Sequence, residues 1–140
     1  MFERITQPAR IVITLAQEEA LRTHHDAVGT GHILLALIRQ SDPEIRKILD
    51  SLNVSAERVR RDVEGIIGRG ELIQGKDVMF NPRSKKVLED ALHECRRLRH
   101  RAMRPQHLLL GLLLAGGIAG EVLASLGVSL ERIRETLKAA

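Results

Sequence analysis

Six histidines are the residues of this 140-residue chain best suited by type to a metal site or to acid–base catalysis. No His-Glu-x-x-His segment occurs, and no carboxylate recurs beside the histidines at the spacing of metal ligands. His32 and His107 stand at equivalent places in two apolar segments, HILLALI and HLLLGLL. We therefore predict that these two imidazoles are structural groups hydrogen-bonded to the backbone, and we expect no metal and no other cofactor. The six are His24, His25, His32, His93, His100 and His107.

A glycine-rich segment from Gly70 to Asp77, GELIQGKD, nearly matches the phosphate-binding loop G-x-x-x-x-G-K-[ST]. The last position of that loop needs a hydroxyl group for Mg²⁺, and Asp77 occupies it. Such a loop also follows a strand and opens a helix, whereas Gly70 follows a predicted helix. We interpret the segment as a linker, not as a nucleotide site.

The composition argues against several classes of function. Phe2 and Phe80 are the only aromatic residues, which argues against a protein that stacks nucleic-acid bases on aromatic rings. The single cysteine, Cys95, excludes an internal disulfide and a cysteine-rich zinc site. No nucleophile–base pair and no paired carboxylates are visible, so we expect no enzymatic activity.

The positive charge is concentrated in one part of the chain. The net charge is +4, and residues 83–104 alone carry eight Lys or Arg against three acidic residues. Basic residues at the end of a helix complement its dipole. The functional alternative is an acidic partner, either a protein or nucleic acid bound non-specifically. Because no helix-turn-helix signature or second basic stripe accompanies the cluster, nucleic acid is the less favoured partner.

The start of the chain, MFERITQPARIV, lacks the apolar region and cleavage site of a secretory signal. The longest uncharged apolar stretch, residues 108–120, is shorter than the roughly 20 residues of a membrane span. We expect a cytoplasmic protein that does not enter a membrane.

The sequence is a tandem duplication of about 70 residues. At an offset of 74, ILDSLNVSAERVR aligns with VLASLGVSLERIR. We predict repeat one over about 1–68, a linker over about 69–79 and repeat two over about 80–140. Five residues of repeat one recur at an offset of 75: Val12, Ala16, Glu19, His25 and His32 match Val87, Ala91, Glu94, His100 and His107.

Each repeat is predicted to form four helices, because apolar residues recur at three- and four-residue spacing and no segment alternates with period two. Thr6 and Asn81 are the predicted N-caps of the first helices, and Ser55 and Ser129 those of the fourth. The second helix of each repeat is apolar nearly all round and is predicted to be buried on several sides. The fold class is therefore all-α, a tandem pair of four-helix repeats related by a pseudo-twofold axis and without β-structure.

Five segments carry a family resemblance: MFER at the start, LAQEEA, G-T-x-H-I-L-L-A-L, SLxVSxERVR and FxPRxKKVLE. The sequence resembles the N-terminal domain of Clp/Hsp100 unfoldases of the ClpC type over essentially all 140 residues. The resemblance implies a pair of four-helix repeats that docks adaptor proteins, substrates and, in some ClpC proteins, phosphoarginine tags. A family member would continue beyond the position of Ala140 into the first of two ATPase rings.

The resemblance also implies a phosphoarginine site where the second helix of each repeat begins with G-T-E-H in the family. The glutamate pairs with the guanidinium of the ligand. This sequence has Thr30-Gly31 in repeat one and Pro105-Gln106 in repeat two, so both glutamates are absent. Pro105 also removes a hydroxyl and an amide donor. We expect phosphoarginine recognition to be lost or greatly weakened; the alternative is that Gly31 and Gln106 are plain surface variants.

In actinobacterial ClpC proteins, which this sequence resembles, the equivalents of Phe2, Phe80 and Lys85 receive cyclic-peptide antibiotics. Glu89 also matches that surface, and Thr14 departs from its usual valine. One interpretation is that each ring packs back on the helix that follows it. The other is that both rings are partly exposed and form one apolar binding spot.

These observations favour a non-catalytic protein- or peptide-binding module of the Clp system. Its expected partners are adaptors, substrate proteins or cyclic peptides, and a free domain would act as a decoy for the ClpC unfoldase itself. The first alternative is the docking domain of a complete ATP-dependent ClpC-type unfoldase. The second is a basic helical nucleic-acid-binding protein.

Overall fold

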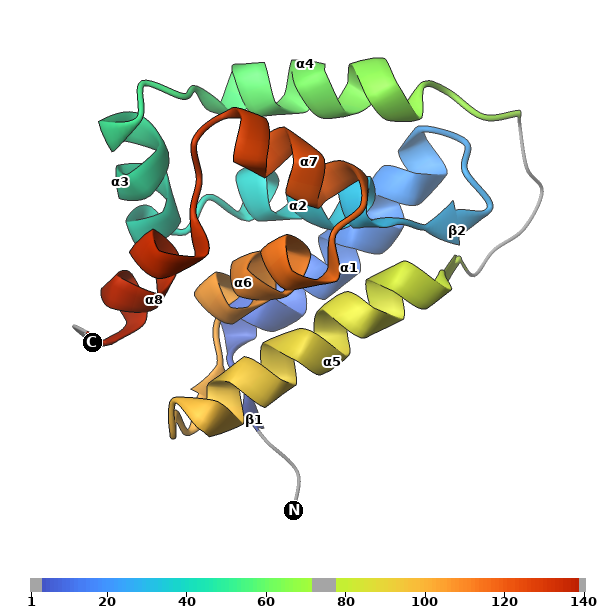
Figure 1. Ribbon diagram of the computed structural model, residues 1–140. Coiled ribbons are helices and arrows are strands. Elements are labelled where there is room, and N and C mark those ends of the chain that lie inside the picture. The colour runs from blue at the N-terminus through green and yellow to red at the C-terminus, as the bar shows by residue number, and fades with distance from the viewer. Residues whose placement is uncertain (1–3, 72–77, 139–140) are drawn as a thin grey trace.

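The computed structural model describes residues 4–71 and 78–138. Within these ranges the chain forms eight helices and four strands of two residues each (Figure 1). The predicted class, an all-α pair of four-helix repeats, is confirmed. The elements in chain order are β1 (Arg4–Ile5), α1 (Gln7–Arg22), β2 (Ala27–Val28), α2 (Thr30–Gln40), α3 (Pro43–Ser51), α4 (Ala56–Ile67), β3 (Met79–Phe80), α5 (Pro82–Arg97), β4 (Ala102–Met103), α6 (Pro105–Ala115), α7 (Ile118–Ser125) and α8 (Leu130–Lys138).

Four helices begin at the capping residues that the sequence predicts. The Thr6 Oγ1 atom accepts a hydrogen bond from the backbone N–H three residues further on (3.3 Å), and Asn81 Oδ1 does the same at 2.9 Å. Ser55 and Ser129 cap α4 and α8 in the same way. Each oxygen satisfies an amide that the first helical turn leaves without a partner.

The four strands correct the sequence analysis, which expected no β-structure. β1 pairs in parallel with β4, and β2 pairs in parallel with β3. Strands of two residues contain no alternation that a sequence pattern could reveal. β1 corresponds to β3 and β2 to β4 at the offset of 75, so each pair joins a strand of one repeat to a strand of the other. The two repeats are therefore tied together at two equivalent places.

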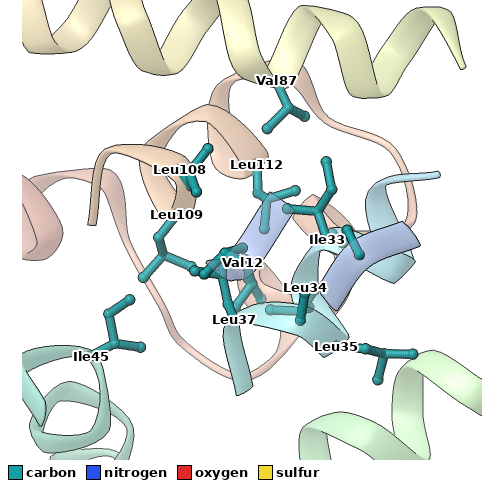
Figure 2. Packing of buried hydrophobic residues seen from close by; sticks show 14 of the residues in the cluster. Val12, Ile33, Leu34, Leu35, Leu37, Ile45, Val87, Leu108, Leu109 and Leu112 are labelled. Atoms are coloured by element: carbon teal, nitrogen blue, oxygen red, sulfur yellow. The ribbon is translucent and has the colours of Figure 1, made fainter. Parts of the chain in front are cut away.

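The helices α2 and α6 form the centre of the molecule. Eight consecutive residues of each, 30–37 and 105–112, are buried, which confirms the burial predicted from their apolar sequences. Side chains of α1, α2 and α6 meet there, as Val12, Leu37 and Leu109 show in Figure 2. α6 also contacts α5, α7 and α8 of its own repeat. The core is therefore shared by the repeats and is built from aliphatic side chains.

Within the described part of the chain, no single helix is both long enough and apolar enough to cross a membrane. α6 and α7 pass that test only as a pair, and the pair is bent by 99°.

Replacing Gly111 with alanine tests how closely α5 and α6 pack. A Cβ atom at this position would lie 2.4 Å from the carbonyl oxygen of Val87 in α5, so one of the two backbones would have to move. We expect Gly111→Ala to lower the free energy of unfolding by about 2 kcal/mol, although alanine is the better helix former. Urea unfolding followed by circular dichroism measures the change.

Gly65→Ala in α4 is the matched control, because a Cβ atom there meets no atom within 4 Å. It is expected to raise the free energy of unfolding by about 0.5–1 kcal/mol. A gain in stability from both variants would contradict the close approach of α5 and α6.

Candidate functional site

The predicted peptide-binding face lies at the start of α5. Phe80 ends β3, is partly buried and packs against the apolar core, as a hydrophobic residue before an N-cap often does. Lys85 and Glu89 are exposed and four residues apart, so they share one side of α5. Phe2 lies outside the described residues, so the joint apolar spot stays a prediction.

Thr14 is exposed on α1. Gln17, one turn further along α1, donates a hydrogen bond from Nε2 to the carbonyl oxygen of Val78 (3.4 Å). Val78 comes two residues before Phe80. The hydrogen bond therefore holds the Thr14 side of α1 beside the segment that leads into Phe80.

The start of α2 lines a cleft of about 490 Å³, whose other walls come from residues 25–27, the C-terminal end of α4 and the starts of α5 and α7. Thr30 Oγ1 accepts a hydrogen bond from the backbone N–H of Ala119 in α7 (3.2 Å). Gly31 is buried, and a Cβ atom there would lie 3.0 Å from a methyl group of Ile67 and 3.2 Å from one of Val63. A glutamate at position 31 would therefore have to displace side chains of α4.

The start of α6 is the equivalent place in repeat two, and there Gln106 is 2% exposed. Its Nε2 atom donates a hydrogen bond to Oε2 of Glu44 in α3 (3.2 Å), while its buried Oε1 atom has no hydrogen-bond partner. A glutamate at this position would face the Glu44 carboxylate, and the two negative charges would repel. Gly31 and Gln106 are both buried, so the interpretation of them as surface variants is wrong.

A pair of histidines fixes the start of α2. His32 Nδ1 accepts a hydrogen bond from the backbone N–H of Gly29 (2.9 Å), so the ring proton sits on Nε2. That nitrogen lies 3.0 Å from Nδ1 of His25, whose Nε2 in turn lies 3.1 Å from the carbonyl oxygen of Ile67. The chain of hydrogen bonds connects the start of α2 to the end of α4.

Repeat two repeats this arrangement. His107 Nδ1 accepts from the backbone N–H of Arg104 (2.9 Å), and its Nε2 lies 2.9 Å from Nδ1 of His100. The backbone hydrogen bonds predicted for His32 and His107 are confirmed. Burial, together with the neighbouring histidine, lowers the pKa of each of these two imidazoles to about 4. Both are therefore neutral at pH 7.

Repeat one also buries a carboxylate, that of Glu19 in α1, which is 1% exposed. It accepts hydrogen bonds from Arg22 (2.9 Å), Arg39 (3.0 Å) and Arg60 (3.3 Å). Burial alone would raise the pKa of Glu19, but the hydrogen bond from Arg22 and the charge of Arg60 together hold it below the ordinary value. The carboxylate joins α1, α2 and α4.

Glu94 in α5 is the equivalent carboxylate of repeat two and accepts hydrogen bonds from Arg97 and Arg134, both at 2.9 Å. The hydrogen bond from Arg97 is the main cause that lowers the pKa of Glu94 to about 2, against the effect of burial. Glu19 matches Glu94 in the sequence, but no role was predicted for the pair. Their recurrence among the buried positions of the first helix of each repeat was the signal.

No group of three or more His, Cys, Asp or Glu residues within 4–71 and 78–138 could hold a metal ion. The two histidine pairs and the two carboxylate clusters satisfy buried polar groups instead. What the described surface offers is an exposed helix start, a cleft and exposed charge, which are features suited to binding.

Comparison with known proteins relates the chain to one family. A sequence model described as the Clp repeat (R) N-terminal domain matches residues 4–113 and 79–140. The ClpC/MecB protein of Bacillus subtilis, described as a negative regulator of genetic competence, is 43% identical over 136 residues. That match covers 96% of this chain but only 17% of the relative, so the chain spans about one sixth of its length.

Solved structures agree. The N-terminal domain of the chaperone ClpD from Arabidopsis thaliana superposes with a TM-score of 0.74 at 28% identity, covering 94% of this chain and 90% of that one. A ClpV N-domain in complex with a VipB peptide has a TM-score of 0.74 at 15% identity, covering 96% and 84%, which shows a shared fold.

The histidine pairs predict that the free energy of unfolding falls as the pH drops from 6.5 towards 4. In this range the unfolded chain, whose histidines titrate near 6.5, binds protons that folded His32 and His107 do not. Stability therefore rises with pH through the window and is complete above it. At pH 5 the loss is about 1–2 kcal/mol for each histidine, measurable by urea unfolding at pH 5 and 7.

The double variant His32→Gln, His107→Gln removes both titrating groups, and glutamine at this helical position can still accept from the N-cap amide. Its stability should vary less with pH than that of the wild type. His93→Gln, at an exposed position of α5, is the control and should keep the wild-type slope. A double variant with the full slope would contradict the assignment.

Proposed function

Because this chain belongs to the family of Clp repeat N-terminal domains, we propose that it is a non-catalytic protein-binding module that serves a Clp chaperone or protease. The observation that carries the proposal is the match of the family model across both repeats. The shared core and the two strand pairs make the body one platform. Binding at its surface is the activity that such a platform supports.

The binding face of the proposal is the start of α5 with Phe80, Lys85 and Glu89, together with the Thr14 side of α1. A partly buried aromatic residue beside exposed charges of both signs suits a peptide with an apolar residue and polar neighbours. The ClpV N-domain that shares this fold was solved with a VipB peptide, and peptide binding is transferred to this chain on that likeness.

Adaptors, substrate proteins and cyclic-peptide antibiotics are the proposed ligands, and the proposed location is the cytoplasm. As a free domain, the chain would compete with the ClpC unfoldase for these ligands and act as a decoy. As part of a longer chain, it would be the docking domain of a ClpC-type unfoldase, since its relatives are about six times longer. Both forms of the proposal use the same face.

Weak phosphoarginine recognition is part of the proposal. Methyl groups of α4 approach Gly31, and Glu44 occupies the neighbourhood of Gln106. Thr30 Oγ1 accepts a hydrogen bond from Ala119 in α7, and Pro105 has no N–H to offer. Positions 31 and 106 therefore do not supply the glutamate that pairs with a guanidinium in the domains that this chain resembles.

Capture of proteins from a cell extract tests the binding face. The double variant Phe2→Ala, Phe80→Ala is expected to lose proteins that the wild type retains, because it removes both aromatic side chains. Since Phe80 packs on the core, Lys85→Glu is a second variant that changes the same face without a cavity, and it should also reduce capture.

Lys47→Glu, the same change of charge at an exposed position of α3, is the control and should capture as the wild type does. Equal capture by all four proteins would remove the α5 face from consideration. Circular dichroism of each variant checks that it is folded.

Calorimetry with free phosphoarginine tests the proposal that this chain recognises phosphoarginine weakly. Little heat is expected from the wild type, because the guanidinium finds no carboxylate at position 31 or 106. In the double variant Gln106→Glu, Glu44→Gln the charge moves back to the start of α6 without a facing carboxylate, and binding should strengthen. Micromolar affinity of the wild type would defeat the prediction.

A further inference from the structure

The duplication lets repeat one serve as a reference for the buried carboxylate of repeat two. Arg22 corresponds to Arg97 at the offset of 75, and Arg60 corresponds to Arg134 at the offset of 74. In repeat one a second carboxylate bridges the two arginines, because Oε2 of Glu64 accepts from Arg22 (2.5 Å) and from Arg60 (3.4 Å). Two guanidinium groups thus hold two carboxylates, one buried and one nearer the surface.

Repeat two lacks the second carboxylate. Lys138 stands at the position of Glu64, and because it follows Arg134 by four residues it lies on the same side of α8. Over residues 4–71 and 78–138, Glu94 is the one carboxylate paired with Arg97 or Arg134. The two arginine side chains are 48% and 29% exposed, so an anion from outside can reach both.

The neighbouring position differs as well. Arg39, which pairs with Glu18 and Glu19 in repeat one, is replaced by Leu114, an apolar residue that is 39% exposed. Repeat one therefore balances three arginines with three glutamates, one of which is the buried Glu19. The six equivalent positions of repeat two hold three cations, one carboxylate, His93 and an exposed leucine.

We propose that Arg97, Lys138 and Arg134, with Leu114 beside them, form a docking surface for an acidic segment of a partner protein. A glutamate or aspartate of that segment takes the place that Glu64 holds in repeat one and bridges the two arginines. An apolar residue next to it packs on Leu114. Here we call these four residues the α5–α8 surface.

The size and composition of the surface favour a protein over a nucleic acid. The reference in repeat one is a single carboxylate between two guanidinium groups, a geometry that arginine forks match well. A nucleic acid is bound mainly by several cations spaced along its phosphates, whereas this surface groups three cations beside one exposed leucine. Because exposed ion pairs contribute little on their own, the contact with Leu114 is an essential part of the surface.

The α5–α8 surface is separate from the face at the start of α5. Lys85 and Arg97 lie twelve residues apart on one helix, which places them about 18 Å apart along its axis. Phe80→Ala therefore tests the first surface and Lys138→Glu the second, so either proposal can fail alone.

The test is fluorescence anisotropy with a labelled peptide that carries one Glu-Glu-Leu segment in a glycine–serine background. The wild type is expected to bind it more tightly than the same peptide with Gln-Gln-Leu. Lys138→Glu supplies the missing carboxylate from within the chain and should weaken binding about tenfold, the scale of one lost charge-assisted contact. Its melting temperature should not fall, because the substitution reproduces the arrangement of repeat one.

Lys47→Glu, an equal change of charge at an exposed position of α3, is the matched control and should bind as the wild type does. Equal weakening by both variants would mean that only net charge matters and would overturn the proposal. So would unchanged binding by Lys138→Glu, or tighter binding of a DNA duplex than of the peptide. Weaker binding of a Glu-Glu-Ser peptide would support the role of Leu114.

Discussion

Two central helices that are apolar nearly all round are the constraint on which this fold depends. A helix with eight consecutive buried residues needs neighbours all round, because each large aliphatic side chain left in water would forgo about 1.5–3 kcal/mol. α2 and α6 obtain those neighbours from both repeats and from each other. Neither half of about 70 residues closes its own core, which is the difficulty that chains of this size commonly face.

The parts of the fold that could be predicted act within one helical turn or recur with the repeat. Thr6 and Asn81 fix their helices by contacts three residues away, and the backbone role of His32 followed from its match with His107. The contacts of Thr30 with α7 and of Gln106 with α3 join residues 89 and 62 positions apart. Patterns of neighbouring residues cannot predict contacts at such sequence separations. Strands of two residues are too short to show the alternation of side chains that predicts a strand.

The candidate site was located by resemblance, but its physical meaning came from packing. The sequence shows that a glutamate is missing at position 31, while only the approach of α4 shows that glycine fits the space that remains. In the sequence, Glu64 and Lys138 are only one mismatch between the repeats. The structure gives the mismatch a meaning, because Glu64 bridges Arg22 and Arg60. Because the two repeats share the same helices, the change from Glu64 to Lys138 leaves the arginines of repeat two without the second carboxylate that repeat one provides.

The crossed strand pairs have a consequence for chains that carry one repeat. Such a chain owns one strand of each pair, and a single copy has no partner for either strand. Two copies related by a twofold axis complete both pairs and bury both central helices. A chain with one repeat is thus expected to assemble as a homodimer, whereas the duplicated chain replaces that concentration-dependent assembly with a folding step inside one polypeptide. A cut between the repeats would make the union of the halves concentration-dependent and would allow halves to exchange between molecules.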